Sequence, residues 1–225
     1  MHGDIRAQKI AKTMRARNID NFSVWREKMR IAGKFGLPTQ ALHRSGDLAE
    51  FIGVVLGDGN ISAFPRTERL LIACDLHKPG FVARYTDLTR KLFSKEPTVT
   101  KMKDINCIRI SLYQKGIAKR LGLPTGNRAH LVYQLPQWIV KSRPFRIRFL
   151  RGLYEAEGSY SIHKPTYTYK LLFSNKNKSL LDIVYDGILF LGFHPHRSSD
   201  KIQLSRREEI EQCLSLLKFR NYGSV

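Results

Sequence analysis

The chain has 225 residues, enough for one sizeable domain or for two fused halves. Its 39 Lys and Arg against 19 Asp and Glu give a net charge of +20, which favours a polyanionic partner, either nucleic acid or an anionic membrane surface. No apolar run approaches the length of a membrane span, so we expect no membrane partner.

Secretion and disulfide bonding are not indicated. The first residues, Met1 to Asp4, contain no apolar core, so no signal peptide is predicted. Cys74, Cys107 and Cys213 are widely separated and odd in number, which suggests neither a disulfide framework nor a zinc site. We therefore expect a reducing compartment, either the cytoplasm in association with the nucleoid or an organellar matrix.

Residues 1–40 are predicted to form a basic helical extension. They carry nine Lys or Arg against three Asp or Glu. One helix is expected over 5–15, and a second begins at an Asp20–Asn21 cap and carries the apolar residues Phe22, Trp25, Met29 and Ile31. Two interpretations stay open: the arm binds DNA, or it packs on the main domain through Phe22 and Trp25.

A first half is predicted over 41–122, with the element order αββαββα. Its leading helix is expected to begin at Asp47, with Glu50 as capping partner, and to end at Asp58. The later elements follow from hydrophobic periodicity and a turn at Lys103–Asp104. They are strands over 60–64 and 70–76, a helix over 80–93, strands over 98–101 and 107–112, and a helix over 114–121.

Residues 123–141 contain proline and glycine without a sustained period and are predicted to be a linker. A second half over 142–225 then repeats the same order. Its helices are expected to begin at a Ser142 cap, at an Asn177 cap, and at Ser205 with Glu208 as capping partner. Its strands are expected over 159–163, 166–174, 196–197 and 201–204.

The predicted fold class is α+β, with two pseudosymmetric αββαββα halves that form a saddle of two antiparallel sheets. Because helices would cover one face of each sheet, the other face is free. Basic and polar strand residues favour binding of double-stranded DNA on that face, where a strand ribbon can enter the major groove. The candidates are Arg66, Arg69, Lys101, Arg109, Lys164, Thr168, Lys170 and Arg197.

The leading helices of the two halves end in nearly the same pattern. FIGVVLGDG spans 51–59 and LRGLYEAEG spans 150–158, at an offset of 99 residues. Each has small residues four apart on one helix face, which lets two backbones approach closely. These pairs are Gly53 with Gly57 and Gly152 with Ala156.

Each copy then ends in a carboxylate followed by glycine, Asp58–Gly59 and Glu157–Gly158. The glycines suit the left-handed residue that closes many helices. The carboxylates lie at the negative end of the helix dipole, which is unfavourable. A divalent cation between the two helix ends would remove this penalty.

These motifs resemble the signature of the LAGLIDADG homing endonucleases, and the resemblance covers about residues 47–217. LRGLYEAEG and its lead-in over 135–139 are the closer match, whereas FIGVVLGDG is more divergent. The first acidic position of the signature is Leu56 in one copy and Glu155 in the other, and the final acid is Asp in one half and Glu in the other. The resemblance implies a monomeric, two-motif enzyme that breaks both DNA strands and leaves short 3′ overhangs.

The resemblance also implies roles for particular residues. Asp58 and Glu157 would bind Mg²⁺ (or Mn²⁺), with the backbone carbonyls of Gly57 and Ala156 completing the shell. The family places a basic or amide residue near each metal, and the candidates are Lys103, Lys201 and Asn175. Glu155 lies on a different helix face from Glu157 and is expected to be structural.

Three non-cleaving alternatives stay open. A descendant of the family could act as a maturase on intron RNA or as a transcriptional regulator, and a general basic RNA-binding protein is a more distant interpretation. The acids at both helix ends favour cleavage, because a pure binder has no evident need for like charges close together. The basic arm favours a regulator.

Overall fold

The computed structural model describes residues 2–16, 23–34, 40–103, 105–127 and 131–222. The chain divides into two units, Met1–Gly36 and Leu37–Val225. The first unit has the two expected helices, α1 (His2–Ala16) and α2 (Ser23–Ile31), and no residue of α2 is buried. The predicted cap at Asp20–Asn21 and the side chain of Phe22 lie outside the described residues.

The second unit has the predicted order αββαββα in each half. The first half consists of α3 (Gly46–Gly57), β1 (Gly59–Phe64), β2 (Thr67–Asp75), α4 (Pro79–Phe93), β3 (Thr98–Lys101), β4 (Cys107–Gln114) and α5 (Ile117–Leu121). The second half consists of α7 (Arg143–Glu157), β5 (Gly158–His163), β6 (Thr168–Ser174), α8 (Lys178–Phe190), β7 (His196–Arg197), β8 (Lys201–Leu204) and α9 (Arg207–Leu217). Of the predicted turn at Lys103–Asp104, Asp104 lies outside the described residues.

One helix was not predicted. A single turn, α6 (Gln137–Val140), interrupts the segment between the halves, and it is too short to give a periodic pattern in the sequence. A second short element, the 3₁₀ turn η2 (Lys164–Thr166), joins β5 to β6.

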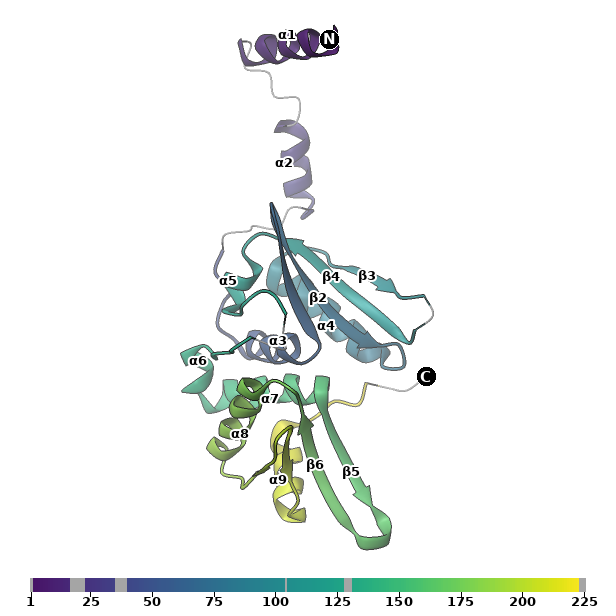
Figure 1. Ribbon diagram of the computed structural model, residues 1–225, viewed down its shortest axis with the longest axis vertical. Helices are drawn as coiled ribbons and strands as arrows, with labels where there is room; N and C mark the ends of the chain where they lie inside the picture. Colours follow the sequence, from purple (N-terminus) through teal and green to yellow (C-terminus); the bar gives the residue numbers. More distant parts are fainter. Residues whose placement is uncertain (1, 17–22, 35–39, 104, 128–130, 223–225) are drawn as a thin grey trace. The chain divides into compact units, whose positions relative to one another are not determined.

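The two sheets are antiparallel and have equivalent strand orders, β1-β2-β4-β3 and β5-β6-β8-β7. Helices pack on one face of each sheet, and the buried residues of β2, such as Leu70 and Ile72, alternate with less buried ones. Figure 1 shows α3 and α7 at the middle of this unit, with one sheet above them and the other below. The predicted α+β fold of two pseudosymmetric halves is confirmed.

The small residues of α3 and α7 permit unusually close packing of the two helices. A Cβ atom built on Gly53 would lie 2.2 Å from the backbone oxygen of Phe149, and one on Gly152 would lie 2.2 Å from the backbone oxygen of Glu50. Real Cβ atoms do not approach backbone atoms so closely, so only glycine fits at these two positions. The predicted contact through small residues is therefore present.

The two glycines after the acids have a different role from the one expected. Gly59 and Gly158 are the first residues of β1 and β5, and neither has a positive φ. A Cβ on Gly59 would lie 2.6 Å from the backbone oxygen of Val55, and one on Gly158 would lie 2.6 Å from that of Tyr154. The prediction of left-handed caps is wrong: these glycines let the chain fold back against the last helical turn.

Two predicted helix caps are also wrong. The N-cap of α3 is Ser45, whose hydroxyl accepts from the Leu48 N–H at 3.2 Å. Asp47 and Glu50 instead bind arginines on distant elements. Before α9, Ser205 accepts from the Gln203 side chain, and the helix has no side-chain cap. By contrast, the predicted Asn177 cap accepts from the Leu180 N–H at 3.1 Å.

Cys74, Cys107 and Cys213 are free thiols. Within the described residues, no helix combines the length and the apolar character that crossing a bilayer requires.

Candidate functional site

The C-terminal ends of α3 and α7 meet. A Cβ on Gly57, the last residue of α3, would lie 2.5 Å from the Ala156 Cβ and 3.5 Å from the Glu157 Cγ. Asp58 follows Gly57 directly, and its N–H donates to the Val54 oxygen at 2.8 Å, continuing the helical pattern. The two acids singled out by the sequence therefore stand on helix ends that touch.

Asp58 lines a cavity of about 380 Å³ at the ends of β2 and β4, the two central strands of the first sheet. The Asp58 backbone oxygen accepts from the Ala73 N–H at 3.0 Å, which ties the end of α3 to β2. Burial raises the pKa of the Cys74 thiol to about 12, and the nearby negative charge of Asp58 adds to this effect. The remaining polar residues of the cavity are Asp75, Lys78, Asn106 and Glu155.

Glu157 lines a second cavity, of about 490 Å³, in the equivalent place of the other half. Asn175 follows β6 and donates its Nδ2 to the Glu157 Oε2 at 3.0 Å. The Asn175 N–H donates to the Asp200 oxygen at 3.0 Å, which holds the loop before β8 at the same place. The hydrogen bond to Glu157 places the Asn175 amide beside the second acid, and its role there stays a prediction.

The strand register identifies equivalent residues in the two sheets. Gly59 lies opposite Ile72, and Gly158 lies opposite Phe173, so Ala73 corresponds to Ser174. Ala73 lies opposite Arg109, and Ser174 lies opposite Lys201.

Arg109 is therefore the counterpart of Lys201. Lys103, the candidate chosen from the sequence, is an exposed residue of the turn between β3 and β4. The loops before β4 and β8 differ in length, so counting residues from the preceding strand does not align Arg109 with Lys201. The correspondence is visible only in the strand register. Each of the two residues lies on the open face of its own sheet. Arg109 lies opposite Ala73, which lines the Asp58 cavity, and Lys201 lies opposite Ser174, which lines the Glu157 cavity.

Of the eight predicted DNA-binding residues, four lie on the open sheet faces, two lie in turns and two point to the helix-covered side. Residues that face each other across strands share a sheet face. By this criterion Arg69, Arg109, Thr168 and Lys170 lie on the open faces. Arg66 lies in the turn between β1 and β2, and Lys164 lies in η2.

The expectation that Lys101 and Arg197 belong to the open faces is wrong. Lys101 lies opposite Ile108, and Arg197 lies opposite the buried Ile202, so both project toward the helix-covered side. Arg197 forms an ion pair with Asp182 of α8. Successive strand residues point to opposite faces, and the register decides which face each one occupies. The sequence alone does not fix the register, so it does not show that these two residues face the helices.

A cluster of charged residues surrounds Glu50 of α3 and Glu155 of α7. Glu50 is 0% exposed and binds Arg84, Arg148 and Arg220. The carboxylate of Glu155 accepts from the Arg220 N–H at 2.9 Å and from the Tyr85 hydroxyl at 3.1 Å. This structural place agrees with the role expected for Glu155. Sequence reasoning missed the cluster as a whole, because its members come from α3, α4, α7 and the C-terminal segment.

The donor atoms of the site suit a hard divalent cation. Asp58 and Glu157 offer carboxylate oxygens, the ligands that Mg²⁺ prefers. In the described part of the chain, no three or more His, Cys, Asp or Glu residues are grouped so as to hold a metal. Mg²⁺ commonly takes one or two carboxylates and fills its shell with water and phosphate oxygens, so these residues fit a cation shared with a bound phosphate.

No protein-family model matches the chain. Among solved structures, the homing endonuclease I-DmoI in complex with DNA and Mn is 20% identical, with a TM-score of 0.52, and the match covers 78% of this chain and 98% of that chain. An I-DmoI variant with its target DNA in the presence of Mg is 18% identical, with a TM-score of 0.53 and coverage of 78% and 97%.

The N-terminal LAGLIDADG domain of WhiA is also similar. It is 17% identical, with a TM-score of 0.51, and the match covers 84% of this chain and 90% of that chain. The chain therefore has the LAGLIDADG fold, and the resemblance stated from the sequence is confirmed as a likeness of fold.

Proposed function

We propose that the protein is a site-specific endonuclease that hydrolyses both strands of double-stranded DNA with the help of a divalent cation. The observation that carries this proposal is the meeting of two acid-tipped helices, α3 and α7, with each acid in its own pseudosymmetric cavity. The fold is shared with DNA endonucleases that have been solved with DNA and Mn or in the presence of Mg.

In this proposal Asp58 and Glu157 hold the cation, and the backbone carbonyls of Gly57 and Ala156 are further ligands. A bound divalent cation polarises the scissile phosphate and lowers the pKa of a bound water. Asn175 orients the Glu157 carboxylate through its Nδ2. Lys201 and, by the register, Arg109 supply positive charge beside the two phosphates. Lys103, the candidate chosen from the sequence for the first half, lies in the exposed β3–β4 turn.

The two open sheet faces differ in sequence, so we infer a long, asymmetric DNA target. On the first sheet, the Arg69 Cζ atom lies 5.6 Å from the centroid of the Phe64 ring. Near the tip of the second sheet, the side chains of His163, Thr166 and Thr168 form a hydrogen-bonded chain. One chain supplies both halves, so a monomer suffices. A gene position inside an intron would accord with homing.

Mutagenesis tests the proposal. The target is first selected from a randomised duplex library by cleavage in Mg²⁺ and sequencing of the cut ends. Asp58→Asn and Glu157→Gln are each expected to abolish double-strand cutting, while DNA affinity stays within about threefold of the wild type, because only a metal ligand is lost. Gel-shift titrations and product analysis measure the two effects separately.

Asp87→Asn is a matched control, because this acid lies on the exposed side of α4 and binds Arg90. It is expected to cut as the wild type does. Wild-type cutting of both strands by either Asp58→Asn or Glu157→Gln would disprove the assignment of the site.

A second function is favoured by a specific observation. The N-terminal LAGLIDADG domain of WhiA, which is named for its fold and not for a nuclease activity, shares this fold, so a non-cleaving DNA-binding protein is a second candidate. A non-cleaving DNA-binding regulator would select a duplex in the presence of Mg²⁺, leave it intact, and bind it equally well after Asp58→Asn. A maturase would instead bind intron RNA more tightly than DNA.

A further inference from the structure

Two aromatic side chains lie exposed on the open face of the first sheet. Phe64, the last residue of β1, is 44% exposed, and Tyr113, near the end of β4, is 46% exposed. Their ring centroids are 6.3 Å apart. Arg69 lies opposite both Tyr113 and Ser62, and Phe64 points to the same face as Ser62 because the two are two residues apart. We call Phe64, Arg69 and Tyr113 the distal cluster.

The charge of the distal cluster is positive and is not neutralised within the sheet. The Arg69 guanidinium lies close enough to the Phe64 ring for a cation–π contact. In the part of the chain that the structure describes, its Nε is buried without an acceptor. The neighbouring acid, Glu68, points to the helix side, where its Oε2 accepts from the Ala118 N–H at 2.8 Å. The cluster therefore combines apolar rings with a cation, which suits an anionic partner that also has apolar groups.

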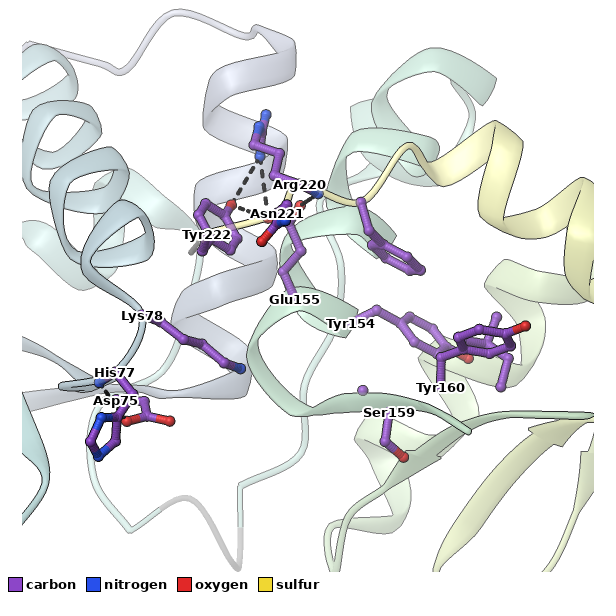
Figure 2. A pocket seen from close by; sticks show the side chains of 13 residues that line it. Asp75, His77, Lys78, Tyr154, Glu155, Ser159, Tyr160, Arg220, Asn221 and Tyr222 are labelled. Atoms are coloured by element: carbon purple, nitrogen blue, oxygen red, sulfur yellow. Dashed lines mark hydrogen bonds and ion pairs between the residues drawn. The ribbon is translucent and has the colours of Figure 1, made fainter. Parts of the chain in front are cut away.

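Another exposed aromatic residue, Tyr160 of β5, does not have these properties. It lies opposite the buried Leu171, so it points to the helix-covered side of its sheet. Figure 2 shows Tyr160 at a cavity that the carboxylates of Asp75 and Glu155 also line. A phosphate backbone would meet those carboxylates at close range. Exposure of an aromatic ring alone therefore does not indicate DNA contact; the sheet face and the local charge decide.

The second half has polar side chains at all three positions of the distal cluster. The strand registers identify the equivalent residues, because Gly59 corresponds to Gly158 and Arg109 to Lys201. The counterparts are His163 for Phe64, Lys170 for Arg69 and Ser205 for Tyr113. The apolar part of the cluster is thus a property of the first sheet, and the two sheets present different chemistry at equivalent places.

We propose that the distal cluster determines specificity by binding the 5-methyl group of a thymine in the major groove of the target. This inference rests on the proposed function, because it takes the open sheet faces as the DNA-binding surface. Bases in a duplex are stacked on one another, so a protein in the groove meets their edges, and the thymine methyl group is the edge feature that apolar side chains contact. Arg69, held against the Phe64 ring, binds a neighbouring phosphate and fixes the register.

The length of β1 predicts where this thymine lies. The strand begins at Gly59, directly after Asp58, and ends at Phe64. At about 3.4 Å per residue, Phe64 is roughly 17 Å from the end of α3. A DNA strand advances about 3.4 Å per nucleotide, so a β-strand that follows the groove places Phe64 about five base pairs from the centre of the site. We expect the thymine there, on one side of the centre and not on the other.

Replacement of thymine by uracil tests the proposal, because the two bases differ only by the methyl group. A duplex is selected from a randomised library by binding to the full chain without divalent cations, so cleavage is not required. Each thymidine of the selected duplex is then replaced in turn by deoxyuridine, and gel-shift titrations measure the affinity. At one position, about five base pairs from the centre, the wild type is expected to bind about fourfold more weakly, the effect of burying one methyl-sized apolar group.

Variants of the cluster connect this effect to the two rings. Phe64→Ser and Tyr113→Ser should each bind the thymine and uracil duplexes with nearly equal affinity, because the apolar contact is lost, whereas Phe64→Leu should still prefer thymine. Val99→Thr is the matched control. Val99 is 45% exposed on the same sheet, but it lies opposite the buried Ile110 and so points to the helix side. It should keep the wild-type preference for thymine.

Two outcomes would overturn this inference alone. Either the wild type binds every uracil duplex as tightly as the thymine duplex, or Phe64→Ser and Tyr113→Ser, with unchanged thermal melting, both keep the wild-type preference for thymine. A wild type that selects no duplex at all would overturn the proposed function together with this inference. Because the assay measures binding without metal, loss of cutting by itself does not affect the result.

Discussion

The hydrogen bond from Asn175 to Glu157 makes one residue of the second cavity testable apart from the acid itself. Under the proposed function, Asn175→Ala removes the donor that orients the Glu157 carboxylate. A hydrogen bond to a charged group contributes about 1.5–3 kcal/mol, so the strand served by Glu157 should be cut about tenfold more slowly or worse. The strand served by Asp58 should be cut as before, so nicked DNA should accumulate.

Ser161→Ala, on the open face of β5, is the control for this prediction and should leave the ratio of nicked to linear product unchanged. Equal slowing of both strands by Asn175→Ala would contradict the assignment of one acid to each strand.

Asp47 makes the stability of the protein depend on pH. Burial alone would raise the pKa of Asp47, but Lys91, Arg148 and Arg84 together lower it to about 2. An unfolded Asp has a pKa of about 3.9, so the unfolded state takes up the proton first as the pH falls. The stabilisation is therefore complete above about pH 5 and is lost between about pH 4 and pH 2.

Urea unfolding at pH 6 and pH 3 measures this effect. Between pH 6 and pH 3 the free energy of unfolding should fall, and Asp47 should account for on the order of 1 kcal/mol of this fall because its side chain is partly exposed. In Asp47→Asn the fall should be smaller than in the wild type by that amount. Lys91→Met should also make the free energy of unfolding depend less on pH, because Lys91 is one of the groups that lower the pKa of Asp47. A wild-type pH dependence in Asp47→Asn would show that the ion pairs around it contribute nothing.

At the scale of elements, the contact between α3 and α7 depends on the absence of a methyl group. Gly53→Ala would place a Cβ 2.2 Å from the Phe149 oxygen and 2.8 Å from the Leu153 nitrogen, and backbone atoms cannot move away without separating the helices. We expect a loss of about 3 kcal/mol in the free energy of unfolding and a fall in Tm of roughly 6–12 °C.

Gly187→Ala in α8 is the matched control for Gly53→Ala. Its Cβ would meet methyl groups of Leu150 at 3.1 and 3.3 Å, and a side chain can adjust. Alanine also has the better helix propensity, by about 1 kcal/mol, so this variant should melt near the wild-type temperature. If the two variants melt alike, close packing of α3 on α7 does not limit stability.

At the scale of the whole molecule, the net charge of +20 should make DNA binding strongly dependent on salt. With on the order of 6–8 phosphate contacts, the slope of log K against log salt should be about −5 to −7. Lys170→Ala on the open face should reduce the magnitude of this slope by about 1.

Arg197→Ala is the control for Lys170→Ala, because Arg197 points to the helix side and pairs with Asp182. It should leave the slope unchanged. A flat salt dependence of the wild type would exclude the open faces as the DNA-binding surface.

Local patterns in the sequence were sufficient for the αββαββα order of each half, although not for the short elements α6 and η2, and for the duplication and the two acid-tipped helices. Periods of 2 and 3.6 residues, the Asn177 cap and the repeated small residues act over a few neighbours, so they are visible without the fold. The same reasoning failed at Gly59 and Gly158, where crowding by the preceding helical turn, and not left-handed backbone, requires glycine.

Only the tertiary structure decided the features that join distant residues. Strand register moved Lys101 and Arg197 to the helix side and aligned Arg109 with Lys201. Folding also brought Arg220 to Glu50, 170 positions away in the chain. The physical reason is the same in each case: such contacts depend on where separate elements meet in space, and no pattern among adjacent residues encodes that meeting.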